Sequence, residues 1–306
     1  MRSMRLVAPL FALVLLAADA AAQDKGSVNP VALPPINPAD PKTPAKEIFG
    51  RKNTPLPVQA RSIGFYTAGC IAGAVALPIN GKTWQVMRLS RNRNWGHPKL
   101  IAFLERFAPK AKAAGWNGLL VGDMAQARGG PMRTGHMSHQ VGLDADIWLT
   151  PMPHRELTRE EREDMSATMI VRDDRLDVDP KVWTPAHVAV IRTAAQDPDV
   201  ERIFVNAAIK KALCREATGD RSWLQKVRPW WGHDYHFHVR VGCPKDSPEC
   251  KAQPETHAGE GCGKELDYWF SDAVLHPKPP AVPPKPKPPM TLANLPPACR
   301  QIVLAP

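Results

Sequence analysis

The sequence predicts an α+β fold in which a central antiparallel sheet is flanked by helices. Helix-like and strand-like segments interleave without a regular β-α-β period, and no internal repeat is visible. Residues 144–149 and 234–241 alternate apolar and polar side chains as strands do, whereas residues 100–107 place apolar side chains at helical spacing. Six cysteines and two proline-rich stretches further predict terminal extensions that disulfides pin to the folded body.

The predicted helices start and end at recognisable residues. Residues 100–107 carry apolar side chains at i, i+3, i+4 and i+7, and Gly115 follows as a closing residue. Thr158 and Glu161 form a capping box, and Thr184 followed by Pro185 starts another helix. Residues 207–214 are also expected to be helical. Residues 118–124 and 200–206 are predicted as short strands.

The two ends of the chain differ in composition from its middle. Residues 1–22 have the basic start, the apolar run and the small residues of a secretory signal peptide, with a non-cleaved anchor as the alternative. The proline content of residues 23–60 argues against a regular core element, so we expect an extended lead-in. The folded domain is expected over 61–275, followed by a proline-rich tail over 276–306 that returns to the domain through Cys299. After removal of the signal peptide, no membrane span is expected.

Two predicted strands present polar side chains on one face each. In 234–241 the aromatic and valine residues face the core, so His236 and His238 share the opposite face. In 144–149, Asp146 takes the exposed side in the same way, together with Asp144 and Trp148. Imidazole and carboxylate groups at this density are ligands that a zinc ion needs.

If these two strands are neighbours, His139, Asp146 and His238 surround one metal ion and leave a fourth position for water. Three protein ligands plus water is the arrangement of a catalytic rather than a structural zinc site. His236 fits the general base and His233 the group that steadies the oxyanion, although the sequence allows these two roles to be exchanged.

Four further residues have alternative interpretations. His136 is either an additional ligand, through H-x-x-H with His139, or an ordinary loop residue. Asp144 is a candidate for orienting a ligand rather than binding the metal. Trp230 and Trp231 are expected to belong to the core or to the wall of a cleft, with a dedicated substrate platform as the alternative.

The cysteines are spaced as in a disulfide-bonded exported protein. No C-x-x-C pair is present, which argues against a cysteine zinc site or a thioredoxin-like centre. Cys243 and Cys250 are close enough to close a small loop, and Cys70 is the natural partner for Cys299. The sequence alone leaves the full connectivity open.

These motifs resemble the penicillin-insensitive murein endopeptidases, a family grouped with the lysostaphin-like and D-Ala-D-Ala metallopeptidases that share H-x6-D and H-x-H. The resemblance rests on residues 128–132, 135–148 and 230–240 and on the cysteine layout, and it covers the chain from about Ser62 to Cys299. It implies a periplasmic zinc endopeptidase that cuts D-alanyl–meso-diaminopimelyl cross-links in peptidoglycan.

The resemblance also implies roles for individual residues. His139, Asp146 and His238 would hold the zinc, with His136 as a further ligand, while His236 and His233 would act on the water and the oxyanion. The implied disulfides are Cys70–Cys299, Cys214–Cys262 and Cys243–Cys250. Some family members bind a second ion through D-x-x-H; here Asp173 is the counterpart, and Leu176 stands in place of the histidine.

Charge and motif content narrow the function further. The formal charge of +10 fits an anionic wall polymer as partner. The sequence contains no basic-aromatic motif of the kind that binds nucleic acid, so a nucleic-acid partner is not expected. No S-x-x-K or G-x-S-x-G offers a serine for a β-lactam to acylate, so insensitivity to penicillin is expected. Two alternatives are a carboxypeptidase or dipeptidase that acts on free D-Ala-D-Ala ends and a non-catalytic, zinc-containing wall-binding module.

Overall fold

The computed structural model describes residues 25–280, 282 and 285–306. The expected signal peptide, residues 1–22, lies outside the described residues. Within the described part of the chain, no helix combines the length and apolar character needed to cross a bilayer.

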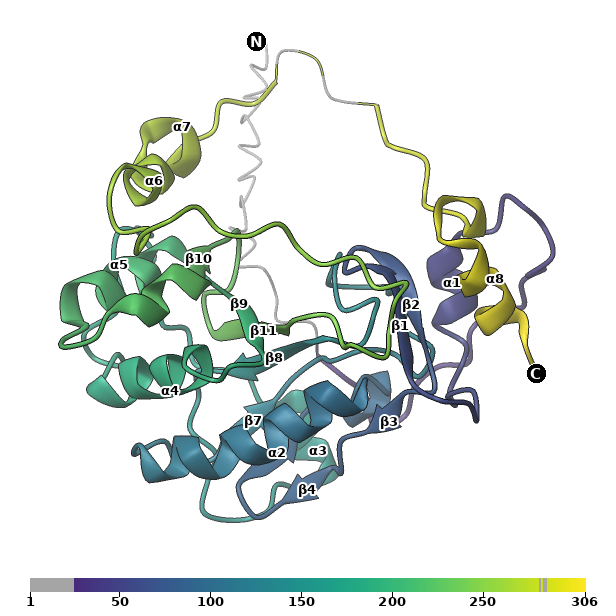
Figure 1. The fold of residues 1–306 in the computed structure, drawn as a ribbon, viewed down its shortest axis with the longest axis horizontal. Helices are drawn as coiled ribbons and strands as arrows, with labels where there is room; N and C mark the ends of the chain where they lie inside the picture. Colours follow the sequence, from purple (N-terminus) through teal and green to yellow (C-terminus); the bar gives the residue numbers. More distant parts are fainter. Residues whose placement is uncertain (1–24, 281, 283–284) are drawn as a thin grey trace, which may run out of the picture.

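A seven-stranded mixed sheet forms the centre of the molecule (Figure 1). In spatial order its strands are β10 (Val227–Pro229), β9 (Val200–Val205), β11 (His236–Val241), β8 (Asp144–Trp148), β7 (Leu119–Val121), β5 (Trp84–Val86) and β4 (Asn80–Gly81). The middle strands β9, β11, β8 and β7 are antiparallel, as predicted. The edge pair β4–β5 is antiparallel as well, whereas the pairs β10–β9 and β5–β7 are parallel, so the antiparallel prediction holds for the sheet except at these two pairs.

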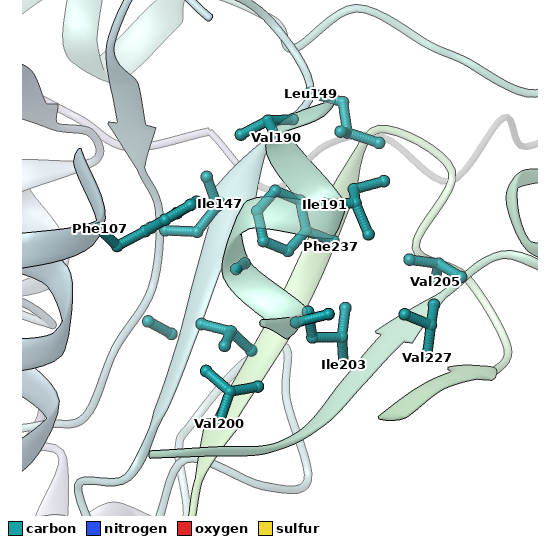
Figure 2. Close-up of a cluster of buried hydrophobic side chains, with 14 of the residues drawn as sticks. Phe107, Ile147, Leu149, Val190, Ile191, Val200, Ile203, Val205, Val227 and Phe237 are labelled. Atoms are coloured by element: carbon teal, nitrogen blue, oxygen red, sulfur yellow. The ribbon is translucent and has the colours of Figure 1, made fainter. Parts of the chain in front are cut away.

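Helices α2 (Pro98–Ala113) and α4 (Pro185–Ala195) pack against one face of the sheet and enclose the main core. The ring of Phe107 on α2 meets that of Phe237 on β11 edge to face, with ring centres 6.4 Å apart. Figure 2 shows these two rings beside Ile147 of β8 and Ile191 of α4. The apolar faces predicted for the helix at 100–107 and for both strands therefore meet in one core.

The predicted helix ends are confirmed. Gly115 follows the C-cap residue Ala114 of α2 and adopts φ +93°, a conformation that favours glycine. The capping box of Thr158 and Glu161 opens α3 (Arg159–Asp164), and Pro185 occupies the first turn of α4. Helix α5 (Ala207–Glu216) follows β9 directly, and the side chain of Asn206 caps it by accepting from the backbone N–H of Ala208 at 2.8 Å.

The proline-rich lead-in contains a regular core element, contrary to the prediction. Helix α1 (Ala45–Phe49) lies beside α8 (Pro297–Leu304), far from the centre of the sheet (Figure 1). Phe49 is fully buried in a second core that also contains Ile302 and Val303. Each segment is too short to form a stable helix alone, but the two ends bury their apolar residues against each other. Composition within either segment could not show this.

All three implied disulfides are present. Cys70–Cys299 ties α8 to β2 (Ala68–Ala72), which forms a hairpin with β1 (Arg61–Phe65). Cys214–Cys262 joins α5 to the segment before α6 (Lys264–Asp267), and Cys243–Cys250 closes a short loop after β11. The remaining elements are β3 (Val75–Ala76), β6 (Trp95–Gly96), α7 (Asp272–Leu275), η1 (Leu89–Arg91), η2 (Ser222–Lys226), η3 (Tyr268–Phe270) and η4 (Leu292–Asn294).

Candidate metal centre

The two strands predicted to carry the site are direct neighbours. In the antiparallel register of β8 and β11, His238 lies opposite Asp146 and His236 lies opposite Trp148. Residues paired in this way point to the same side of a sheet, so these four side chains share the face opposite to the core of Figure 2. The alternation predicted the face of each strand, and the pairing of β8 with β11 supplies the neighbourhood that the sequence analysis had assumed.

The face itself is not exposed, which corrects the prediction for β8. Asp144 is fully buried, Asp146 is 4% exposed and Trp148 is 5% exposed. Trp148 packs in a small cluster with Met87 and Leu157, which come from other parts of the chain. These segments pack over the second face of the sheet. The alternation of side chains along a strand shows which residues share a face, but not whether another segment buries that face. The carboxylates therefore sit in a desolvated setting where each needs a partner.

The loop before β8 carries His139 into the same space. His139 has φ +69°, and its backbone N–H donates to Asp144 Oδ2 at 3.0 Å. Gly142 has φ +72°, and a Cβ there would come within 2.5 Å of Ile71. A left-handed conformation at a non-glycine residue is strained, so the buried Asp144 carboxylate stabilises a conformation that the chain would otherwise avoid.

Asp146 lies at the centre of a group of histidines. Its Oδ1 is 3.2 Å from His238 Nδ1 and 3.5 Å from His139 Nε2, and its Oδ2 is 3.3 Å from His136 Nε2. His236 Nε2 is slightly farther, at 3.7 Å from Asp146 Oδ1. Burial alone would raise the pKa of Asp146, but the imidazoles, His136 foremost, hold that pKa well below its usual value. The carboxylate is therefore ionised and available as a ligand.

The donor set fits a divalent metal ion. Both ring nitrogens of His139 and Oδ1 of Asp146 are buried without a hydrogen-bond partner among the described residues. Such atoms are costly unless a further group satisfies them. His136, His139 and Asp146 each place one potential ligand atom within 4.8 Å of the other two. Among the described residues, this is the cluster of three His, Cys, Asp or Glu side chains that could hold a metal ion. The cluster includes His136, whose role as a ligand the sequence did not decide. His238 lies next to the cluster, with its Nδ1 facing Asp146.

Asp144 and Arg240 hold His238 from behind. Asp144 Oδ1 lies 3.1 Å from His238 Nε2, and it also accepts from Arg240 Nε at 2.7 Å. Burial opposes protonation of His238, but Asp144 and then Asp146 raise the pKa of its ring. With Nε2 facing Asp144, Nδ1 is the nitrogen that faces the centre. This contact places Asp144 where a residue that orients His238 would lie, and that role stays a prediction.

Asp123 is the contact that the sequence analysis missed. It follows β7, is 4% exposed, and places Oδ2 3.2 Å from His136 Nε2. Arg91 and Arg93 pair with the same oxygen at 2.9 and 2.7 Å. Burial alone would lower the pKa of His136, but Asp146 and Asp123 raise it to about 9. In the sequence, the sign that Asp123 belongs to the site was a single acidic residue just after an apolar strand.

His233 and His236 lie at the open side of the group. Their ring centres are 4.8 Å apart, and His233, at φ +61°, donates from Nδ1 to the carbonyl of Trp231 at 2.8 Å. Burial lowers the pKa of His236 to about 4 against the opposing effect of Asp146. Burial, and then His236 and His238, lower the pKa of His233 well below its usual value. Both rings are therefore neutral near pH 7.

A cleft of about 570 Å³ opens onto this group. Trp230 and Trp231 line this cleft rather than the core, and Met137 and Phe65 contribute to the lining. The cleft brings the two predicted segments, 135–148 and 230–240, to one surface. It is large enough to take a short stretch of peptide.

Asp173 is not brought to the metal centre. It lies on an exposed turn, and it does not belong to the His136, His139 and Asp146 group. A second ion at Asp173 stays a prediction from the resemblance.

The comparison with known families agrees with the site. The model of the penicillin-insensitive murein endopeptidase family matches residues 62–304, which include both site segments and all six cysteines. The chain belongs to this family. Within it, a penicillin-insensitive murein endopeptidase of Haemophilus influenzae is 48% identical over 238 residues, covering 76% of this chain and 83% of the relative.

Two further relatives carry the same description. The protein of Pectobacterium atrosepticum is 44% identical over 264 residues, covering 86% of this chain and 89% of the relative. That of Escherichia coli O1:K1 is 44% identical over 249 residues, covering 81% and 88%. The family match thus includes the whole central sheet and all three disulfides, and of the described helices only α1 lies outside it.

Proposed function

We propose that the chain is a periplasmic, zinc-dependent murein endopeptidase that hydrolyses D-alanyl–meso-diaminopimelyl cross-links in peptidoglycan. The observation that carries the proposal is Asp146 among four histidines, with Asp146 and three of these histidines lining a cleft, in a chain that matches the family over residues 62–304. The positive charge of the chain supports an anionic polymer as substrate.

The proposed metal ligands are His139, Asp146 and His238, with His136 as a fourth candidate. The buried, unpartnered atoms of His139 and Asp146 support this set. Zinc is proposed because imidazole and carboxylate donors suit it. When bound, zinc lowers the pKa of a water molecule and draws electron density from a carbonyl oxygen.

The hydrogen bond of His233 favours one of the two role assignments. A carbonyl only accepts, so Nδ1 of His233 must carry the proton that it donates to Trp231. In a neutral ring Nε2 is then a lone pair, which can accept a proton from the attacking water but cannot donate to an oxyanion. We therefore assign proton transfer to His233. His236, whose ring nitrogens have no partner among the described residues, is free to donate to the oxyanion. This exchanges the roles first suggested by sequence spacing.

A digest of purified cross-linked dimeric muropeptides tests the function. The reaction is followed by chromatography and mass spectrometry, with and without a chelator and in the presence of penicillin. We expect conversion of dimers to monomers that stops with chelator, returns with zinc and is unaffected by penicillin. Release of terminal D-alanine from surviving dimers would instead indicate a carboxypeptidase. Binding to isolated wall without any product would indicate a non-catalytic module.

A further inference from the structure

Three tryptophans form a surface beside the cleft that the proposed chemistry does not use. Trp230 and Trp231 are 53% and 52% exposed, although they belong to a segment that leads directly to His233. Trp269 comes from η3, and its ring centre lies 5.0 Å from that of Trp231 at an interplanar angle of 59°. We call Trp230, Trp231 and Trp269 the aromatic rim. Trp269 is half-buried, whereas Trp230 and Trp231 are exposed aromatic groups at a cleft, which indicates a contact surface.

A recess of about 180 Å³ lies against the aromatic rim. Besides the three tryptophans, it is lined by the polar side chains of Arg175, Asn206 and Asp234. Arg175 uses one guanidinium nitrogen to donate to the carbonyl of Leu275 at 3.3 Å, which fixes the outer wall against α7. Asn206 donates to Asp234, so the polar groups are held by each other and by α5. The recess is therefore built from fixed hydrogen-bonding groups next to flat apolar faces.

The recess continues the cleft. Trp230, Trp231, Gly232 and Asp234 line both the recess and the cleft at the metal centre. A single elongated ligand can thus extend from the reacting bond across Trp231 to Trp269.

The chemistry of this surface selects an amino sugar. A pyranose ring presents an apolar face of C–H groups and an edge of hydroxyl and amide groups, which match aromatic faces flanked by polar side chains. Trp230 and Trp231 are the large exposed apolar residues among those that line the recess, and a peptide stem of alanine and charged residues offers them little to stack against. A lipid surface would favour aliphatic and lysine-rich neighbours instead.

We propose that the aromatic rim and its recess bind an N-acetylated amino sugar of the glycan strand that carries the peptide substrate. This inference rests on the proposed function, because it places the glycan next to the peptide bond that the metal centre cleaves. Trp231 links the two sites, since its carbonyl accepts the hydrogen bond from His233 Nδ1 at 2.8 Å. A sugar stacked on Trp231 would therefore steady the turn that presents His233.

Matched substrates test the subsite through kinetics. One is a cross-linked muropeptide dimer with its disaccharides, and the other is the same cross-linked peptide after an amidase has removed the sugars. We expect the wild-type chain to show a higher kcat/KM for the sugar-bearing dimer, mainly through KM, by about fivefold to tenfold for one or two aromatic stacking contacts.

Substitution at Trp269 separates the subsite from the catalytic centre, because Trp269 lines the recess and not the main cleft. Trp269→Leu keeps an apolar side chain for packing but removes the flat ring. We expect the ratio of the two kcat/KM values to fall toward one. Tyr268→Ala, which removes a 61% exposed aromatic side chain outside the recess, is the matched control and should keep the wild-type ratio.

Direct binding gives a readout that does not depend on catalysis. Tryptophan fluorescence is titrated with tetra-N-acetylchitotetraose in wild type, Trp269→Leu and Tyr268→Ala. Saturable binding to wild type and Tyr268→Ala, weakened at least threefold in Trp269→Leu, supports the subsite even if no hydrolysis is found. Equal kcat/KM for both substrates in wild type, or equal sugar binding in all three proteins, overturns it. Failure to cleave either substrate, with sugar binding intact, would count against the proposed function alone.

Discussion

Removal of the Asp144 carboxylate is the most informative single perturbation. Asp144 accepts from Arg240 Nε at 2.7 Å and Nη2 at 3.1 Å, and from the backbone N–H of His139 at 3.0 Å. Arg240 is only 4% exposed, so Asp144→Ala leaves a buried guanidinium without its counter-charge. Loss of one partner of a buried pair costs about 3–5 kcal/mol of the free energy of unfolding. For a domain of this size that corresponds to a fall in Tm of about 6–20 °C.

The same carboxylate also orients His238, which makes the metal affinity a second measure. Asp144→Asn keeps the shape of the side chain but loses the charge, and we expect zinc affinity to fall about 10- to 100-fold, as for other groups that orient a ligand. Zinc affinity is measured by competition with a chromophoric chelator, and Tm by calorimetry with and without zinc.

Asp164→Ala is the control for both measurements. The Asp164 side chain is 81% exposed and pairs with the exposed Lys25, so its removal should change stability by no more than about 0.5 kcal/mol. The reasoning fails if Asp144→Ala lowers Tm no more than Asp164→Ala does, or if Asp144→Asn binds zinc as tightly as wild type.

Two further predictions concern stability away from the site. Lys210 is fully buried, and burial, followed by the charge of Arg228, lowers its pKa to about 7. Because the unfolded chain then binds more protons between pH 7 and 10.5, this lysine makes the free energy of unfolding rise with pH across that window. Urea denaturation should show wild type gaining about 3 kcal/mol relative to Lys210→Met between pH 7 and pH 9.5, and a constant difference would refute the buried charge. The Cys70–Cys299 and Cys243–Cys250 disulfides span 229 and 7 residues, so loop-closure entropy predicts that replacing the first pair by serine costs about 3 kcal/mol more than replacing the second. Equal losses in urea denaturation of the two double variants would contradict that estimate.

The sequence was informative wherever a local pattern has a direct spatial meaning. Alternation in β11 put His236 and His238 on one face because side chains of a strand alternate with period 2. The same rule aligned Asp144 with Asp146 in β8, and capping residues marked the starts of α3 and α4. The motifs in these segments are also sufficient to identify the family from the sequence alone.

Contacts between distant segments could not be predicted in this way. Asp123 reaches His136 because β7 and the loop before β8 converge, and α1 is stable because α8 covers it. The buried state of Asp146 depends on segments that close over the second face of the sheet. These contacts form because apolar surfaces of distant segments are buried against each other. Which surfaces are buried together is decided only when the whole chain has packed.

The sequence by itself therefore determined the donor groups, the strands that carry them and the family to which the chain belongs. The tertiary structure decided which donors meet, which nitrogen of His238 faces the centre and how His233 is held by Trp231. Residue types and periodicity are local properties of a chain. Desolvation, ring orientation and the approach of Trp269 to the cleft wall arise only from packing between segments that are distant in sequence.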